Sequence, residues 1–420
     1  MSGSRMVLFA GFLLVPALVP SRADFAIRDG DTVVFLGDSI TAERGYSRMI
    51  ENYTLLRYPR RKVRFINAGW GGDTAAGGAR RLQRDVLDAG ATLVTVAYGV
   101  NDIGWGARAD EAHRQAYLDG IRDIVTACRQ RGVRVYICSA AVTAADPDVS
   151  EHDFLQRMCD DGMELARRLG GEAIDVQRMM RDILRRVRAA GHEKDPPTLH
   201  APDGIHLNDL GQLAMGFAIL KGLGAPAEVS SVWIDAAAGR VVEAGGCEVS
   251  NLRASATGAV FDRLDEGLPL NFGPLGALNF RFIPIPEELN RYLLRIDGLS
   301  PGDYRLTVNG RVVGTWSHDR LAGGINISSA TPDAWEPGGP WDAQAATLLL
   351  LTEARHKLAQ SLKLAPGCIG GHPGMPTIER DAAEINRRIE DLQRLVAAPV
   401  RYHFVLERVG PQPASQAGGR

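Results

Sequence analysis

Two segments of the sequence carry residues that could act together as a nucleophile and its base. Ser39 ends the triplet Gly37-Asp38-Ser39, and Asp203 and His206 lie three residues apart in a loop that contains Pro and Gly. A serine hydroxyl attacks an ester when a base removes its proton, and an imidazole oriented by a carboxylate is such a base. These residue types favour ester chemistry with Ser39 as nucleophile, His206 as base and Asp203 as the orienting acid.

The triplet alone also has a simpler interpretation, because Gly, Asp and Ser are the commonest turn residues. A catalytic role requires hydrogen-bond donors aimed at the oxygen that becomes negative when the carbonyl is attacked. Candidate donors follow the next two apolar runs of the chain. They are the backbone N–H of a glycine such as Gly72 in "NAGWGGDT" (67–74), the side-chain amide of Asn101 in "YGVND" (98–102), and the N–H of Ser39 itself.

Other side chains near these segments have either a substrate role or a structural one. Trp70 and Trp105 lie beside the candidate donors, where an indole can stack on a sugar ring, line an acyl pocket or belong to the core. Arg44 follows the nucleophile and is a candidate for substrate contact, although most arginines are solvated. Asp38 and Asp73 are expected to brace their loops by accepting hydrogen bonds from backbone N–H groups.

The positions of these residues relative to apolar runs indicate how they could meet. Short β-branched runs alternate with helical periodicity up to about residue 225, which is typical of a parallel sheet covered by helices on both faces. Ligand sites form at the carboxyl ends of such strands, where Ser39, Gly72 and Asn101 lie, whereas Asp203 and His206 lie in a loop just before a predicted helix. The predicted strands cover residues 32–37, 63–69, 92–99, 133–139 and 172–176, and the predicted helices cover 45–57, 77–88, 110–131, 152–169, 177–190 and 208–223.

A second, β-rich region is predicted after a change of composition near residues 222–229. Short alternating segments follow this change, and Asn309-Gly310 between two β-like runs is a strong hairpin signal. We therefore expect a catalytic domain over residues 24–225 and an accessory domain over residues 226–410.

The accessory domain is expected to contain two helices as well as strands. Helical patterns lie near residues 341–363 and 378–397, and a strand over 400–409 could return to the β-sheet. The second helix carries many arginines, so we expect a solvated face there, with a weak ion pair between Glu390 and Arg394.

The two ends of the chain have compositions of their own. Arg5, an apolar run over residues 6–19 and small residues before Ala23 are typical of a signal peptide over residues 1–23. We expect cleavage near Ala23 and export to the periplasm or the exterior, with no membrane span in the mature chain, although an uncleaved anchor stays open. Residues 411–420 have the composition of a disordered tail.

Charge and cysteine content exclude two further classes of function. The formal net charge is −2, without a basic field that could hold a nucleic acid. The five cysteines show no CxxC spacing and no paired histidines, so we expect no metal site.

The order of the four motifs resembles that of the SGNH (GDSL) hydrolase superfamily. GDS, a Gly-Gly-Asp-Thr segment, Gly-x-Asn-Asp and Asp-x-x-His occur in this order, and the resemblance covers about residues 31–224. It implies that Ser39, Gly72, Asn101 and His206 are the four residues for which the superfamily is named, with Asp203 as the third triad member. Gly71 could supply the amide instead, but Gly72 directly precedes Asp-Thr as in the family block.

This resemblance implies a flavodoxin-like three-layer α/β/α fold and ester hydrolysis through an acyl-enzyme, without a metal or organic cofactor. The β-rich region is similar to C-terminal regions of some secreted bacterial members. We expect a secreted esterase for short acyl groups, above all O-acetyl groups of a carbohydrate, with Trp70, Trp105 and Arg44 as candidate substrate contacts. The alternatives are a lipase, lysophospholipase or thioesterase for longer acyl chains, and a non-catalytic carbohydrate- or surface-binding protein.

Overall fold

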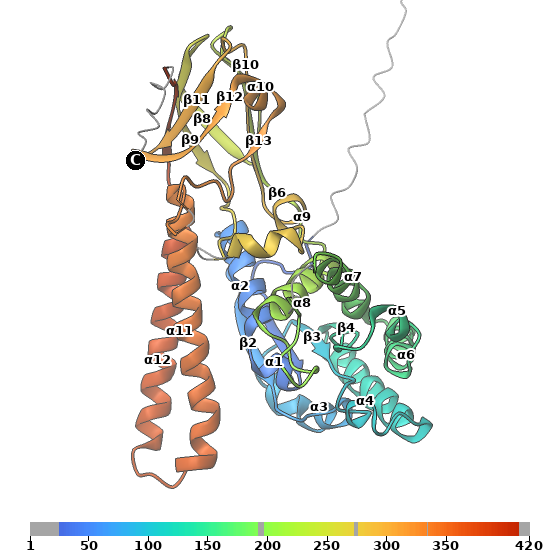
Figure 1. The fold of residues 1–420 in the computed structure, drawn as a ribbon. Helices are drawn as coiled ribbons and strands as arrows, with labels where there is room; N and C mark the ends of the chain where they lie inside the picture. The colour runs from blue at the N-terminus through green and yellow to red at the C-terminus, as the bar shows by residue number, and fades with distance from the viewer. Residues whose placement is uncertain (1–24, 192–196, 273–275, 334, 411–420) are drawn as a thin grey trace, which may run out of the picture.

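The computed structural model describes residues 25–191, 197–272, 276–333 and 335–410. The predicted signal peptide and the predicted disordered tail lie outside the described residues. Figure 1 shows an α/β region, a β-rich region above it, and a long helical hairpin that runs from the β-rich region down along the α/β region.

The α/β region is built on a five-stranded parallel sheet in the order β2-β1-β3-β4-β5. Flavodoxin-like folds have this strand order, and their ligands bind at the carboxyl ends of the strands, where the order reverses beside β1. Each predicted strand is confirmed to within two residues at either end. The strands are β1 (Thr32–Gly37), β2 (Arg64–Gly69), β3 (Leu93–Ala97), β4 (Arg134–Cys138) and β5 (Glu172–Ile174).

Helices connect these strands, as the periodicity predicts. α3 begins two residues earlier than expected and continues as a π-helical turn over Gln83–Leu87. A 3-10 turn spans Gly104–Gly106. The helices are α1 (Ser39–Ala42), α2 (Gly45–Arg57), α3 (Ala75–Leu82), α4 (Glu111–Gln130), α5 (Pro147–Ser150), α6 (Phe154–Arg168), α7 (Val176–Ala189) and α8 (Asp209–Gly222).

Side chains of β1 alternate between two separate cores. Val33 and Phe35 join a core with residues of α2, α7 and α8, whereas Val34 and Leu36 join a core with residues of α3, α4 and α6. A strand that is covered on both faces requires this alternation of apolar side chains. The three-layer α/β/α arrangement is therefore confirmed.

The β-rich region contains two sheets. Its strands are β6 (Glu228–Asp235), β7 (Arg240–Gly245), β8 (Cys247–Ser255), β9 (Gly258–Asp265), β10 (Arg291–Asp297), β11 (Asp303–Val308), β12 (Arg311–Ser317), β13 (Ile325–Asn326) and β14 (Tyr402–Arg408). Its short helices are a 3-10 helix (Gly276–Arg281), α9 (Ile285–Glu288) and α10 (His318–Gly323). The sheet orders are β13-β10-β6-β7 and β12-β11-β14-β9-β8. The Asn309-Gly310 turn joins β11 to β12, and the C-terminal strand β14 pairs with β11 and β9.

A helical hairpin made of α11 (Pro340–Ile369) and α12 (Met375–Ala397) connects the two regions. In the first turn of α11, Trp341 packs against Tyr292 of β10 and Phe404 of β14, with ring centroids 5.0 and 6.0 Å apart. Both helices then pack along α2 (Figure 1). Buried residues of the hairpin, of both β-sheets and of the α2–α8 layer form one continuous hydrophobic cluster, so the two regions share a core.

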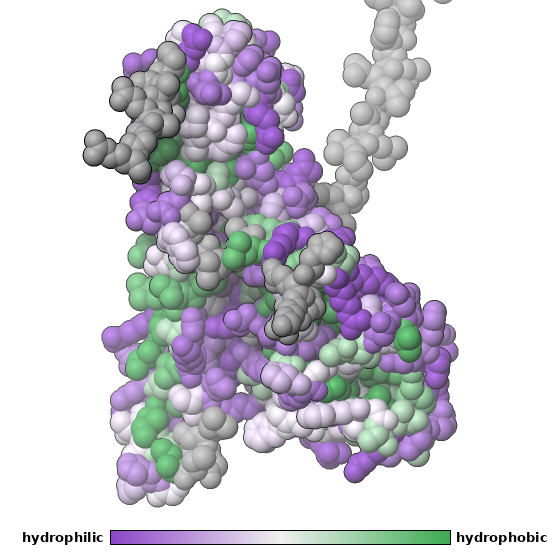
Figure 2. Space-filling model, in the orientation of Figure 1, coloured by the Kyte–Doolittle hydropathy of each residue, from purple (hydrophilic) through white to green (hydrophobic). Residues whose placement is uncertain are grey.

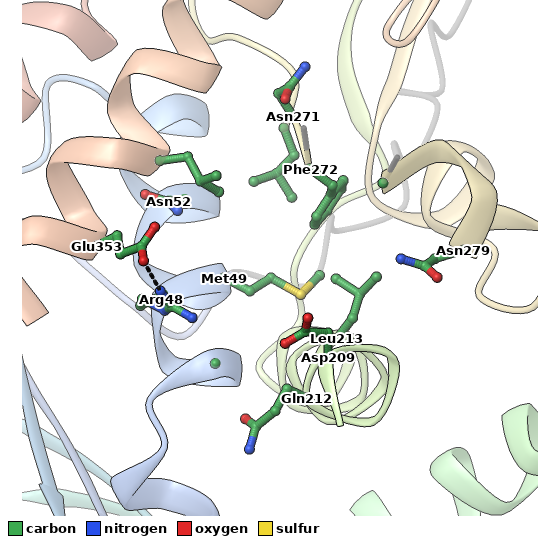
Figure 3. Close-up of a pocket in the computed structure, with 14 residues that line it drawn as sticks. Arg48, Met49, Asn52, Asp209, Gln212, Leu213, Asn271, Phe272, Asn279 and Glu353 are labelled. Carbon is green, nitrogen blue, oxygen red and sulfur yellow. Dashed lines mark ion pairs between the residues drawn. The ribbon is translucent and has the colours of Figure 1, made fainter. Parts of the chain in front are cut away.

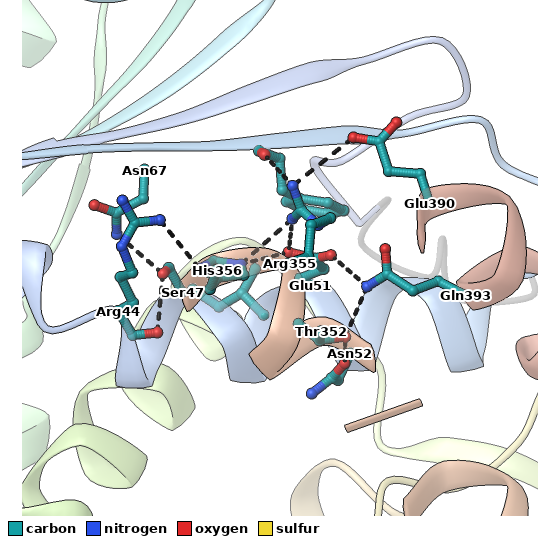
Figure 4. A network of polar contacts seen from close by, with 12 residues as sticks. Arg44, Ser47, Glu51, Asn52, Asn67, Thr352, Arg355, His356, Glu390 and Gln393 are labelled. Atoms are coloured by element: carbon teal, nitrogen blue, oxygen red, sulfur yellow. Dashed lines mark hydrogen bonds and ion pairs between the residues drawn. The ribbon is translucent and has the colours of Figure 1, made fainter. Parts of the chain in front are cut away.

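A buried charge network joins α2 to the hairpin (Figure 4). Glu51 of α2 accepts hydrogen bonds from His356 Nε2 and Gln393 Nε2, each at 2.8 Å, and forms an ion pair with Arg355. Burial alone would raise the pKa of Glu51, but Arg355 and His356 outweigh it and hold that pKa at about 2. The predicted solvated face of α12 is therefore wrong at Gln393, which is buried against α2.

Figure 2 shows green patches among polar residues along the hairpin. The exposed large apolar side chains of its helices include Leu350, Ile378, Ile385, Leu392 and Leu395. Within the described ranges, no helix combines the length and the apolar character that crossing a membrane needs.

Candidate active site

Ser39 lies at the first position of α1, directly after β1. Asp38 caps this short helix by accepting a hydrogen bond from the Ile40 N–H at 3.0 Å, as its predicted bracing role requires. The turn packs tightly onto the end of β2, since a Cβ on Gly69 would lie 2.2 Å from the backbone nitrogen of Ala42. A glycine at position 69 thus allows α1 to sit at the carboxyl edge of the sheet with Ser39 at its start.

His206 contacts both other members of the predicted set. Its Nε2 is 2.8 Å from Ser39 Oγ, and its Nδ1 is 2.6 Å from Asp203 Oδ2. Asp203 also accepts hydrogen bonds from the backbone N–H groups of Ile205 and His206, both at 2.9 Å. The His206 side chain, followed by these two N–H groups, holds the pKa of Asp203 at about 2. A charged Asp203 keeps a proton on Nδ1 of His206, which leaves Nε2 to accept from the Ser39 hydroxyl.

The two predicted donors beyond Ser39 lie next to each other. Asn101 Nδ2 donates to the carbonyl oxygen of Asp73 at 3.0 Å, which ties its amide to the residue after Gly72. Gly72 has a φ of +70° in a turn closed by the Asp73 N–H and the Trp70 carbonyl, a conformation that favours glycine. In the part of the chain that the structure describes, nothing accepts a hydrogen bond from the Gly72 N–H. This N–H and the second Asn101 amide hydrogen are therefore available to a bound oxygen.

Arg81 on α3 connects the ends of three strands, a role that was not predicted from the sequence. Its guanidinium donates to the carbonyl oxygens of Gly37 and Ala68, at 3.0 and 2.6 Å, and to the hydroxyl of Tyr98 at 2.8 Å. It also pairs with Asp73 at 2.7 Å, and Tyr98 donates to the same carboxylate at 2.9 Å. Asp73 therefore binds two side chains and not the backbone N–H groups that we predicted.

Trp105 lies beside the Ser39–His206 contact. Its ring is edge-on to the His206 imidazole, with centroids 5.9 Å apart, and its Nε1 donates to Asn101 Oδ1 at 2.9 Å. Trp105 also adopts a left-handed φ of 58°, which is uncommon for a bulky residue. The hydrogen bond to Asn101 thus fixes a half-exposed indole next to the imidazole.

Trp70 and Arg44 face the helical hairpin. Trp70 is half exposed, and Lys363 Nζ of α11 lies over its ring at 4.7 Å from the centroid. Arg44 precedes α2 and is buried, with its Nη1 3.5 Å from His356 Nδ1. The structure therefore brings Trp105 to the Ser39 centre and places these two candidate substrate contacts at the α11 side.

The comparisons with known proteins add to this geometry. Residues 35–214 match the model of the GDSL-like lipase/acylhydrolase family. These residues form a GDSL-like lipase/acylhydrolase domain. The protein is therefore an ester-hydrolysing enzyme. A comparison with curated proteins found no match to its sequence.

Solved structures are also similar to the chain. BT4096, a gut microbial diltiazem-metabolizing enzyme, superposes with a TM-score of 0.80 at 23% identity, covering 92% of this chain and 100% of its own. LAE5, an alpha/beta hydrolase enzyme from the metagenome of Lake Arreo in Spain, has a TM-score of 0.39 at 22% identity. The match covers 48% of this chain and 98% of LAE5. A mutant of Axe2, an acetylxylan esterase from Geobacillus stearothermophilus, has a TM-score of 0.40 at 19% identity. The match covers 47% of this chain and 96% of the Axe2 chain. The likeness to BT4096 extends over both regions of the fold.

Cysteines of the GDSL-like domain do not gather into a site. Cys128, Cys138 and Cys159 are buried free thiols, and burial raises the pKa of each to about 12. Within the residues described by the structure, no three His, Cys, Asp or Glu side chains cluster as metal ligands would.

A cavity of about 490 Å³ adjoins the GDSL-like domain between α2, α8, α11 and residues 270–272, 276 and 279 (Figure 3). Met49 of α2 and Leu213 of α8 form its apolar wall, and Arg48 pairs with Glu353 of α11 beside them at 3.8 Å. None of the candidate catalytic residues lines this cavity, so it is separate from the Ser39 centre.

A buried carboxyl in the GDSL-like domain makes stability depend on pH. Burial raises the pKa of Asp38 from 3.8 to about 7, so between these values the folded chain holds a proton that the unfolded chain releases. The free energy of unfolding therefore falls as pH rises from about 4 to about 7. An Asp38→Asn variant keeps the helix cap without the charge. The free energy of unfolding of the variant, measured relative to that of the wild type, is expected to increase by about 1–3 kcal/mol as pH rises from 5 to 8.

Urea unfolding of both proteins at several pH values measures this difference. The raised pKa of Asp38 corresponds to a loss of at most about 4 kcal/mol in the free energy of unfolding. Relaxation of the protein around the charged carboxylate makes the actual loss smaller. A difference that stays constant from pH 5 to pH 8 would contradict a raised pKa at Asp38.

Proposed function

We propose that the protein is a secreted serine esterase that removes short acyl groups, O-acetyl groups above all, from a carbohydrate. The observation that carries the reaction type is the 2.8 Å contact between Ser39 Oγ and His206 Nε2, with Asp203 at the opposite ring nitrogen. The family match over residues 35–214 supports ester hydrolysis independently of this geometry.

In the proposed reaction, Ser39 Oγ adds to the ester carbonyl carbon while its proton passes to His206 Nε2. The carbonyl oxygen becomes negative and accepts hydrogen bonds from the N–H groups of Ser39 and Gly72 and from the Asn101 amide. The bond to the alcohol oxygen then breaks, this oxygen takes the proton from His206, and the acyl group stays on Ser39. Water adds to the acyl carbon as His206 removes its proton, and Ser39 leaves with that proton as the carboxylic acid forms.

Two aromatic side chains support a short acyl group on a sugar. Trp105 is fixed by its bond to Asn101 and lies next to His206, where we expect its indole to limit the room for a long acyl chain. Trp70 exposes 49% of its surface, and such an indole face can stack on a sugar ring. The predicted signal peptide supports an exported enzyme that meets polysaccharide outside the cytoplasm.

Hydrolysis of nitrophenyl esters of increasing chain length tests the acyl preference. We expect kcat/KM to be highest for the acetate and to collapse by the octanoate, because the indole of Trp105 restricts the acyl side. Acetate release from acetylated polysaccharides, with an Ser39→Ala variant as the blank, tests the alcohol side. The opposite chain-length order would favour a lipase, lysophospholipase or thioesterase and would overturn the acetyl preference.

A further inference from the structure

A cavity of about 900 Å³ lies between the β2 edge of the sheet and the hairpin, and the reaction proposed above does not use it. Trp70 and Arg44 form part of one wall, and Lys363 and Arg355 of α11 form part of the other. This volume is at the upper end of the range for sites that enclose small molecules.

The cavity wall is continuous with the segments that carry the candidate active site. Trp70 lies two residues before Gly72, and its N–H donates to the carbonyl oxygen of Gly37 at 3.0 Å, two residues before Ser39. Arg44 follows α1, the short helix that Ser39 begins. A molecule that is cleaved at Ser39 could therefore extend its leaving part over Trp70 into this cavity.

The lining of the cavity has an excess of positive charge. Arg84 pairs with Asp85, and Arg355 pairs with Glu51 and with Glu390. In contrast, no carboxylate of the described residues lies within 4.0 Å of the charged nitrogens of Arg44 or Lys363. The basic residues that line the cavity are Arg44, Arg64, Arg84, Arg355 and Lys363, and the acidic residues are Asp85 and Glu390.

The burial and the backbone conformation of Arg44 in the cavity wall are both unfavourable. Only 6% of its surface is exposed, and its Nε has no hydrogen-bond partner. Its backbone has a left-handed φ of 68°, which is uncommon outside glycine. Burial, helped by repulsion from Arg355, lowers the pKa of Arg44 to about 10. Glu51 offsets part of this effect, but no carboxylate of the described residues lies within ion-pair distance of Arg44, so the site favours an incoming anion.

Lys363 supplies a second cation on the opposite wall. Its amine donates to the carbonyl oxygen of Gly69 and lies over the ring of Trp70. Burial first, and then the nearby Arg81 and Arg44, lower the pKa of Lys363 to about 8, so the amine is mostly charged at neutral pH. Two cations without carboxylate partners thus face a cavity that also offers an aromatic surface.

We propose that this cavity binds an oxyanion, a carboxylate or a phosphate, carried by the alcohol half of the substrate. Arg44 and Lys363 bind the anion, and Trp70 stacks on the ring that bears it. The link to catalysis rests on the proposed esterase function, whereas binding of the anion does not depend on it.

Calorimetric titration of the full chain with D-glucuronate, D-glucose 6-phosphate and D-glucose tests the site. We expect the dissociation constant of at least one anionic probe to be ten-fold or more below that of glucose and to rise with salt, as charge pairing requires. The two anionic probes distinguish a carboxylate from a phosphate. Equal affinities for all three probes would overturn the proposal.

Lys363→Met removes the charge and keeps the length of the side chain, and we expect it to weaken anion binding at least ten-fold. Lys357→Met is the matched control, because Lys357 lies on the same helix with its amine exposed and paired with Glu353. Lys363→Arg should restore most of the affinity, which separates loss of charge from loss of folding. Equal binding by the Lys363→Met and Lys357→Met proteins would contradict the site.

The same wild-type preparation is assayed for nitrophenyl acetate hydrolysis. Hydrolysis without anion preference refutes the cavity site and leaves the esterase standing. Anion binding by a protein that cleaves no ester refutes the esterase and leaves an oxyanion site.

Discussion

Replacement of Ser39 by alanine is expected to lower kcat for nitrophenyl acetate by about 10⁶-fold, with the fold unchanged. The hydroxyl is the atom that would carry the acyl group, and its contact with His206 Nε2 has no substitute in the described centre. His206→Ala should cost a similar factor, because the hydroxyl then has no base. The double variant should be no slower than either single one, since the two residues act as a unit.

Stopped assays on highly purified variants measure these rates, and circular dichroism checks the fold. The free energy of unfolding of Ser39→Ala should stay within about 1 kcal/mol of the wild type, because Asp38 and not Ser39 caps α1. Residual turnover above about 1% of the wild type, at this stability, would show that another group is the nucleophile.

The second large effect is expected at the junction of the two regions. Replacing Glu51 by glutamine keeps the shape of the side chain and removes its charge, which leaves Arg355 buried opposite a neutral amide. Breaking a buried ion pair by removing one partner costs about 3–5 kcal/mol. We expect the free energy of unfolding to drop by about 3 kcal/mol at pH 7, as measured by urea unfolding.

The pH dependence of this loss identifies its cause. The folded pKa of Glu51 is about 2 against an ordinary 4.5, so its charge stabilises the fold above about pH 4.5 and loses this effect as pH falls toward 2. The gap between wild type and Glu51→Gln should therefore narrow below pH 4.5. Arg48→Ala is the matched control, because the Arg48–Glu353 pair also joins α2 to α11 but is one-third exposed. It should cost less than about 1 kcal/mol, and an equal loss in both variants would contradict the network.

The local elements of the α/β region could be predicted because each has a local cause. The runs around Val33 and Val94 are apolar on both faces, as strands of a covered parallel sheet must be, and their ends follow from this pattern. Ser39 and Asn101 follow neighbouring strands whose carboxyl ends share one edge of the sheet, so topology predicted that they lie close together. His206 lies in the loop before α8, and its contact with Ser39 was expected from the chemistry of the Asp203-His206 pair and not from the strand order.

What the sequence did not indicate are contacts between elements far apart in the chain. Arg81 is an ordinary arginine in a helix until the ends of β1, β2 and β3 come together around it. The pairing of Glu390 with Arg394 within α12 was predicted and occurs at 4.0 Å, but the burial of Gln393 against Glu51 was not. Local periodicity cannot indicate which surface of a helix meets a partner that lies about 340 residues earlier.

The charge network between α2 and the hairpin also limits where the chain can be divided into separate fragments. A fragment that ends near residue 225 would keep every candidate catalytic residue but would leave the carboxylate of Glu51 without Arg355, His356 and Gln393. Natural recombination or protein engineering at that boundary would separate a helix from the hairpin that neutralises and covers it. We therefore expect the β-rich half and the α/β half to fold as one unit, and an exchange of accessory regions to succeed only if α2 is exchanged along with the hairpin.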